Sequence, residues 1–173
     1  MYKYTKMCRI LEFWDTKFRF CKGKAWRFNK CTKTWKRIDN LVPDAHGYII
    51  VGLSNNDRKV RSLKLHRLVY KSYNPKWDIE DSSMNNHIDH IDGNKLNNHI
   101  DNLRVVTHQE NHFNRTKAKG YTFDKKGMNY RAYIKFNKLI HLGCYDTETD
   151  AREAYLEAKA KYHHITQKQI LNF

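Results

Sequence analysis

The chain has 173 residues, enough for one or two compact domains, and 40% of them are hydrophobic. Its 33 Lys and Arg against 18 Asp and Glu give a net charge of +15 at pH 7, which favours a polyanionic partner and places nucleic acid first. An anionic membrane surface is the rival partner, but the sequence shows no long apolar run and no amphipathic basic helix, and we expect no signal peptide after Met1.

The charge is unevenly distributed along the chain. Residues 1–80 contain 19 Lys and Arg and 7 acids, residues 81–116 contain 3 and 5, and residues 117–173 contain 11 and 6. A mildly acidic centre between two basic flanks suits a cation-binding site between two phosphate-binding arms. The four cysteines show no paired spacing, so we expect reduced thiols at Cys8, Cys21, Cys31 and Cys144.

The first segment, 1–65, alternates aromatic or aliphatic residues with Lys and Arg, which predicts a small antiparallel β-sheet with one basic face. The strand signals are Trp26-Arg27-Phe28, Trp35-Lys36-Arg37-Ile38, Tyr48-Ile49-Ile50-Val51 and Val60-Arg61-Ser62-Leu63-Lys64-Leu65. The run from Leu65 to Tyr73 has apolar residues at helical spacing and stops before Asn74-Pro75, which predicts a short helix.

The second segment, 66–118, reads as strand, loop, strand and helix after that first helix. The expected strands are 87–91 and 102–106, the loop between them is polar and rich in Asn, and a helix is expected over about 108–118. The third segment, 119–173, predicts three strands at 121–123, 130–136 and 139–143, followed by a helix that starts at a cap-like Thr147 and packs on the sheet. The expected fold class is therefore α+β.

Phosphodiester cleavage needs an attacking water, a base that deprotonates it and a cation that stabilises developing charge. Residues 87–114 offer side chains for the base and for binding the cation. Asp89 offers a hard carboxylate oxygen for Mg²⁺ or Mn²⁺, and the adjacent His90 is a candidate general base. Asn111, on the expected helix, offers an amide oxygen as a second metal ligand, and Asn102 can fix the loop that carries His90. By chemistry alone each assignment is weak, because an isolated Asp-His pair is usually just two solvated side chains and a loop Asn is usually a turn former.

The ordered combination is more specific. The run His87-Ile88-Asp89-His90-Ile91-Asp92-Gly93-Asn94-Lys95-Leu96-Asn97-Asn98, followed by Asn102-Leu103-Arg104-Val105-Val106 and Asn111, closely resembles the HNH motif of phage and intron-encoded homing endonucleases, which share a ββα-metal fold. The resemblance covers about residues 46–116. It implies that His90 is the general base, that Asp89 and Asn111 bind one divalent cation, and that Asn102 orients the His90 loop.

Zinc is the alternative to Mg²⁺ or Mn²⁺ at this site. The third residue of the motif is asparagine here, which favours Mg²⁺ or Mn²⁺ over Zn²⁺. A histidine-rich zinc site is conceivable among the four neighbouring histidines, but no Cys-x-x-Cys or closed four-ligand pattern accompanies them. His66 is expected to be a packed or hydrogen-bonded residue rather than a catalyst.

The third segment resembles the Apetala-type DNA-binding domain, a three-stranded sheet backed by one helix that is often fused to HNH nucleases. The resemblance rests on Gly120-Tyr121, the strand Tyr130–Ile134, and His141-Leu142-Gly143-Cys144-Tyr145-Asp146-Thr147 with the helix that follows. Tyr130 and Tyr133 stand where tryptophan is usual, which leaves base preference undecided. The expected DNA contacts here are Lys125, Lys126, Arg131, Lys135, Lys138 and His141, with Arg131 as the candidate for base readout.

The N-terminal arm is expected to bind phosphates along a second stretch of duplex through Arg27, Lys33, Lys36, Arg37, Arg58, Lys59 and Arg61, with Arg104 as a further phosphate contact or a residue behind the metal site. A solvated basic face is a fair competitor for any single lysine. We therefore expect a monomeric, site-specific, metal-dependent DNA endonuclease that nicks duplex DNA, leaves 5′-phosphate and 3′-hydroxyl ends, and acts in the cytoplasm of an infected bacterial host. The alternatives are a non-catalytic DNA-binding regulator on the same scaffold and a less specific nuclease that also degrades RNA.

Overall fold

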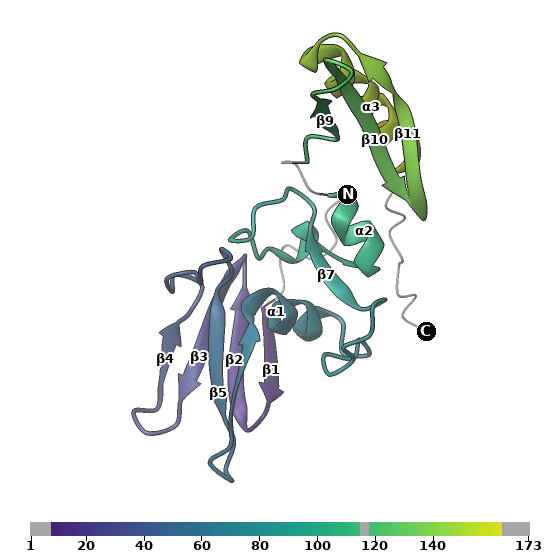
Figure 1. Ribbon diagram of the computed structural model, residues 1–173. Helices are drawn as coiled ribbons and strands as arrows, with labels where there is room; N and C mark the ends of the chain where they lie inside the picture. The colour runs from purple at the N-terminus through teal and green to yellow at the C-terminus, as the bar shows by residue number, and fades with distance from the viewer. Residues whose placement is uncertain (1–7, 115–117, 164–173) are drawn as a thin grey trace. The chain divides into compact units, whose positions relative to one another are not determined.

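The computed structural model describes residues 8–114 and 118–163 (Figure 1). They form two compact units, residues 8–107 and residues 108–163, and both are built from small antiparallel sheets with few helices. The expected mixture of helices and antiparallel sheets is therefore confirmed. The division at 65/66 and 118/119 stays a prediction, and parts of the last predicted domain (164–173) and of the helix predicted over 108–118 (115–117) lie outside the described residues.

The first unit begins with a four-stranded sheet made of β1 (Arg9–Phe13), β2 (Thr16–Cys21), β3 (Lys24–Asn29) and β4 (Thr34–Arg37), paired in chain order. Strand β2 shows why the sheet forms, because its alternate residues Phe18 and Phe20 are buried while Lys17 is exposed and Arg19 is half-buried. The sequence patterns identified β3 and β4 but not β1 and β2. The turn between these two strands is made by Trp14 and Asp15, both at positive φ, and has no glycine or proline to mark it.

The hairpin of β5 (Ile50–Ser54) and β6 (Val60–Lys64) leads directly into helix α1 (Leu65–Tyr73), which has the bounds that the sequence predicts. The helix ends before Asn74-Pro75, because the residue that precedes proline is sterically pushed out of the helical region. One hydrophobic core joins the sheet, the hairpin and the helix through Phe18, Phe20, Val51, Leu53, Leu65 and Leu68.

A second hairpin pairs β7 (His87–His90) with β8 (Leu103–Val106), and a 3-10 turn (Ile100–Asn102) precedes β8. Ile88, Leu103 and Val105 reach the same hydrophobic core as the N-terminal sheet. The hairpin that carries Asp89 and His90 is therefore anchored on the core of the whole first unit, and the two strands predicted around the motif are confirmed.

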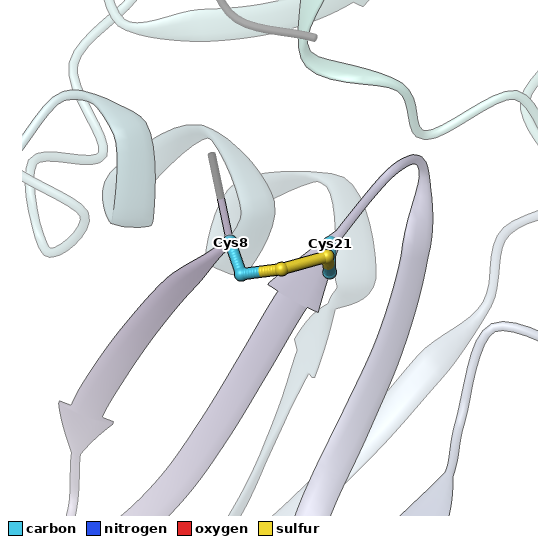
Figure 2. The surroundings of a disulfide bond; sticks show 2 residues. All are labelled: Cys8 and Cys21. Atoms are coloured by element: carbon cyan, nitrogen blue, oxygen red, sulfur yellow. A yellow bond between two sulfur atoms is a disulfide. The ribbon is translucent and has the colours of Figure 1, made fainter. Parts of the chain in front are cut away.

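The expectation of four reduced thiols is wrong for two of them. Cys8 and Cys21 form a disulfide, with their Cα atoms 4.2 Å apart (Figure 2). Cys8 directly precedes β1 and Cys21 ends β2, and the register that pairs Arg9 with Phe20 places the two cysteines opposite each other. Strand register, rather than spacing along the chain, brings these residues together, whereas Cys31 and Cys144 are free thiols.

The second unit contains α2 (His108–Phe113), β9 (Tyr121–Asp124), β10 (Asn129–Phe136), β11 (Lys138–Tyr145) and α3 (Glu148–Tyr162). The three strands form one antiparallel sheet with β10 in the centre, and α3 lies against it (Figure 1). Ile134 of β10 packs with Tyr155 and Ala158 of α3. The predicted cap is confirmed, since the Thr147 hydroxyl accepts a hydrogen bond from the Asp150 amide at 3.1 Å.

Gly120, which precedes β9, is required by this packing. Its φ is +79°, and a Cβ atom there would lie 2.0 Å from the ring of Tyr155. The backbone before the sheet can therefore approach α3 only because this position has no side chain.

Candidate active site

Asp89 lies on β7 directly opposite Arg104 of β8. Arg104 donates from Nε and Nη2 to Oδ2 of Asp89, at 3.0 and 2.8 Å, and the Asp89 side chain is 8% exposed. A carboxylate is costly to bury unless a charged partner and hydrogen bonds compensate it. Arg104 provides both, so it holds the Asp89 carboxylate at a fixed place.

His90, the last residue of β7, is 4% exposed and lies against two other rings. Its imidazole meets His66 of α1 edge to face at 4.9 Å between ring centroids, and Tyr48 lies 6.2 Å away. Burial lowers the pKa of His90, although a hydrogen bond to Asn98 and the charge of Asp89 oppose that effect. His90 is therefore neutral at pH 7 and can accept a proton.

His66 stays neutral as well. Burial, followed by the neighbouring His90, lowers the pKa of His66 well below its usual value. The expectation that His66 is a packed residue agrees with its position inside the first unit, at 4% exposure.

The loop after His90 is held by a network of amide side chains. Asn102 accepts a hydrogen bond from the Asp92 amide at 3.0 Å, and it donates to Oδ1 of Asp92 at 2.9 Å and to the Asn97 carbonyl at 2.8 Å. Asn97 also donates to Oδ2 of Asp92 at 2.7 Å. Burial tends to raise the pKa of Asp92, but these hydrogen bonds outweigh it and the pKa is lowered. The loop is thereby closed on the start of β8.

The chain turns at Gly93, shortly after the end of β7. The φ of Gly93 is +72°, and its amide donates to the His90 carbonyl at 2.9 Å. Asp89 and His90 are consecutive residues of β7, yet both are buried. Two neighbouring polar side chains are thus enclosed at one strand end.

Two lysines lie beside this enclosed pair. The Nζ atoms of Lys64 and Lys95 lie 3.8 and 4.7 Å from the ring centroid of Tyr48, and Lys95 also donates to the His46 carbonyl at 2.9 Å. Burial and the negative charges of Asp89 and Asp44 raise the pKa of Tyr48. The positive charges of Lys64 and Lys95 therefore lie over the Tyr48 ring near His90. This arrangement suits an anionic substrate.

Asn111, the second predicted metal ligand, lies on α2 in the second unit. The pairing of Asp89 with Asn111 on one cation therefore stays a prediction. Within residues 8–114 and 118–163, no three His, Cys, Asp or Glu side chains gather as a metal site. A cation at Asp89 would need amide, phosphate or water oxygens to complete its ligands, and hard oxygen donors of this kind fit Mg²⁺ or Mn²⁺.

Two neighbours of His90, Tyr48 and Asn98, are not predicted from the sequence. Arg104 is predicted as a phosphate contact or a residue behind the metal site, and the structure pairs Arg104 with Asp89. Asn98 is one of several asparagines in a polar loop, so its type alone gave no signal. Tyr48 precedes β5 and looks like any strand aromatic. Only the partner of Asp89 had a usable signal, since Arg104 follows from pairing the two predicted strands in the correct register.

The predicted phosphate contacts of the N-terminal arm separate into two groups. Among them, Arg37 lies on the open face of the sheet and pairs with Asp39 at 2.7 Å. Arg61 likewise pairs with Glu80 at 2.7 Å. Two further basic residues of the open face were not predicted as contacts: Lys17 pairs with Glu12 at 2.7 Å, and Arg19 lies over the ring of Trp26.

Arg27 and Lys36 lie instead on the core-facing side of the sheet, since strand register aligns them with the buried Phe18. They line a groove between β3, β4 and β5, which also contains Lys30 and the amides of Asn29, Asn55 and Asn56. Among the described residues, no carboxylate forms an ion pair with either of them. The other predicted contacts, Lys33, Arg58 and Lys59, belong to the turns that flank this groove.

In the second unit, Arg131 and Lys135 are exposed on β10, and His141 pairs with Tyr133 across the sheet. Ala132 and Ile134 alternate with them and are buried toward α3, so the predicted contacts face away from the helix. Arg131 forms an ion pair with Asp124. Lys125 and Lys126 lie in the turn after β9, and Lys138 begins β11.

No helix in the described part of the chain is long and apolar enough to cross a membrane.

Comparison with known proteins places the described geometry in context. Residues 63–113 match the family profile described as HNH endonuclease. YosQ, a protein of Bacillus subtilis (strain 168) whose name refers to the SPbeta prophage and to HNH homing endonucleases, is 39% identical over 80 residues. That stretch covers 46% of this chain and 43% of the relative, so the match spans less than half the length of either protein. No solved structure matches. The chain thus carries, over residues 63–113, a segment that matches the HNH endonuclease family and that includes Asp89, His90, Asn102, Arg104 and Asn111.

Proposed function

We propose that this protein is a site-specific, divalent-metal-dependent DNA endonuclease of the HNH homing type. The observation that carries the proposal is the enclosed pair on β7: a buried carboxylate held by Arg104, next to a buried histidine that is neutral at pH 7. The pair lies inside the segment that matches the HNH endonuclease family.

In the proposed mechanism His90 removes a proton from water, which attacks phosphorus in line with the departing 3′ oxygen. Asp89 and Asn111 would hold one divalent cation, Mg²⁺ or Mn²⁺, which when bound supplies positive charge for the developing negative charge on the phosphate and the leaving oxygen. Arg104 holds Asp89 in a fixed place, and Asn102 keeps the loop after His90 closed. The products are 5′-phosphate and 3′-hydroxyl ends.

The proposed substrate is double-stranded DNA, bound by phosphate contacts on both sides of the nuclease segment. In the first unit the groove of Arg27 and Lys36 suits a phosphate backbone better than the open face, where Arg37 and Lys17 already pair with acids. In the second unit the sheet face opposite α3 would bind DNA in the manner of an Apetala-type domain. A monomer with one such site cuts one strand per binding event, so we propose nicking, in the cytoplasm of a bacterial host.

The test of this proposal is cleavage of a supercoiled plasmid that carries candidate phage DNA, incubated with Mg²⁺, Mn²⁺ or EDTA. We expect metal-dependent conversion to open circles and no conversion in EDTA. Linear product would show that two strands are cut. Binding to a specific duplex without any cleavage in either metal would overturn the nuclease proposal in favour of a DNA-binding regulator, and equal cleavage of RNA would show a less specific nuclease.

We predict that Lys36, which lines the groove, contributes to DNA affinity. Replacing Lys36 by alanine should weaken binding to all duplexes and lower the slope of log affinity against log salt concentration by about 1, because one phosphate contact and its released counterion are lost. Arg37 is the matched control, since it is the next residue on the same strand but faces the other side and pairs with Asp39. Gel shifts in EDTA at several salt concentrations measure both variants. A larger loss in Arg37→Ala than in Lys36→Ala would place the DNA on the open face.

A further inference from the structure

Asn98 is the hydrogen-bond partner of His90 inside the first unit. Oδ1 of Asn98 lies 3.1 Å from Nε2 of His90, and the two residues are 5% and 4% exposed. Because both groups are buried, a mismatched donor and acceptor would be strongly unfavourable. The chemistry of this one contact therefore constrains where His90 carries its proton.

The orientation of the Asn98 amide follows from its other contact. Its Nδ2 donates to the Leu96 carbonyl at 3.3 Å, which leaves Oδ1 on the side of His90. Rotating the amide by half a turn would place Oδ1 against the Leu96 carbonyl, two acceptors facing each other. An amide oxygen only accepts, so Nε2 of His90 must be the donor.

We infer that Asn98 is a positioning residue that fixes His90 as the Nε2–H tautomer, so that the basic lone pair lies on Nδ1. This inference rests on the proposed function, in which His90 is the general base. During the reaction a water O–H bond breaks and its proton passes to Nδ1. The water oxygen, with the electron pair of that bond, attacks phosphorus while the P–O3′ bond breaks. The imidazolium that forms still donates from Nε2 to Asn98, so the same hydrogen bond serves both protonation states.

Asn102 is connected to His90 through the neighbouring residues Asn97 and Asn98. Asn102 donates to the carbonyl of Asn97, the residue directly before Asn98, and both Asn102 and Asn97 bond Asp92. This network fixes the backbone at Asn98, and Asn98 in turn fixes the imidazole. The hydrogen bonds among these amide side chains thereby set the orientation of the His90 ring.

The test compares Asn98→Leu, which removes the acceptor at similar volume, with Asn98→Gln, which keeps an uncharged amide with both its acceptor and its donor. The control is Asn94→Ala, an exposed asparagine of the same loop. Two readouts are taken on the full chain: ¹⁵N–¹H correlation spectra of the histidine rings at pH 8 in EDTA, with the His90 signals assigned from His90→Ala, and single-turnover nicking with Mn²⁺ alongside DNA affinity.

We expect His90 of the unmodified protein to give the spectrum of the Nε2–H tautomer and Asn98→Leu to lose it. Asn98→Leu should nick about 10²-fold more slowly at unchanged DNA affinity, since general-base catalysis contributes about 10²–10⁴-fold. Asn98→Gln should keep the tautomer and restore part of the rate, and Asn94→Ala should match the unmodified protein.

An Nδ1–H spectrum in the unmodified protein, or a folded Asn98→Leu variant with unchanged tautomer and rate, would overturn the inference. If neither the unmodified protein nor any variant cleaves DNA, the proposed function fails. The tautomer spectra still decide whether Asn98 fixes the His90 ring.

Discussion

Replacing His90 by alanine is expected to slow metal-dependent nicking by about 10²–10⁴-fold while DNA affinity stays within about twofold. The physical reason is that His90 is the one neutral base next to Asp89 on β7, and its loss leaves the attacking water without a proton acceptor. DNA affinity depends instead on surface charge, which this substitution does not change. The measurement is single-turnover nicking of supercoiled plasmid in Mn²⁺, with gel shifts in EDTA on the same preparations.

His46→Ala is the matched control, because His46 is an exposed histidine of the same unit. Since His90 is buried, His90→Asn serves as a second variant that fills more of the space, and near-ultraviolet circular dichroism verifies that each variant is folded. Nicking by folded His90→Ala at the rate of His46→Ala would contradict the assignment of His90 as the base.

Replacing Arg104 by alanine is expected to lower the free energy of unfolding of the first unit by about 3 kcal/mol. Breaking a buried ion pair leaves a carboxylate enclosed without the charge that compensates it, which typically costs about 3–5 kcal/mol, and the 15% exposure of the Arg104 side chain reduces that cost. All four tryptophans, at positions 14, 26, 35 and 77, lie in the first unit, so urea unfolding followed by tryptophan fluorescence reports on this unit.

Lys17→Ala is the control for that measurement. Lys17 pairs with Glu12 in the same unit, but the two side chains are 45% and 68% exposed, and such pairs contribute about 0–1 kcal/mol. The Arg104 effect should shrink when Asp89 is already replaced by asparagine, because no charge is then left uncompensated. Equal losses for Arg104→Ala and Lys17→Ala would show that Asp89 does not depend on the guanidinium.

The sequence by itself determined those features that follow from neighbours along the chain. Helix α1 has the predicted bounds because apolar residues recur at helical spacing and Asn74-Pro75 ends the run. The two strands around the motif and the three strands of the second unit follow from alternation and turn residues, and the cap at Thr147 follows from one local hydrogen bond. The motif residues could be named for the same reason, since their order and spacing are local information.

The tertiary structure alone decided which distant residues meet. The Cys8–Cys21 disulfide and the Asp89–Arg104 pair both depend on strand register, which fixes partners 13 and 15 positions apart in the chain. The turn at Trp14 and Asp15 has no residue that marks it, so β1 and β2 became visible only through pairing. The sequence does not distinguish Asn98 from the other asparagines of its loop. In the structure its buried Oδ1 lies 3.1 Å from Nε2 of His90. The physical reason is common to all of these: composition and periodicity are properties of a segment, whereas register and burial are set by packing the segments on one core.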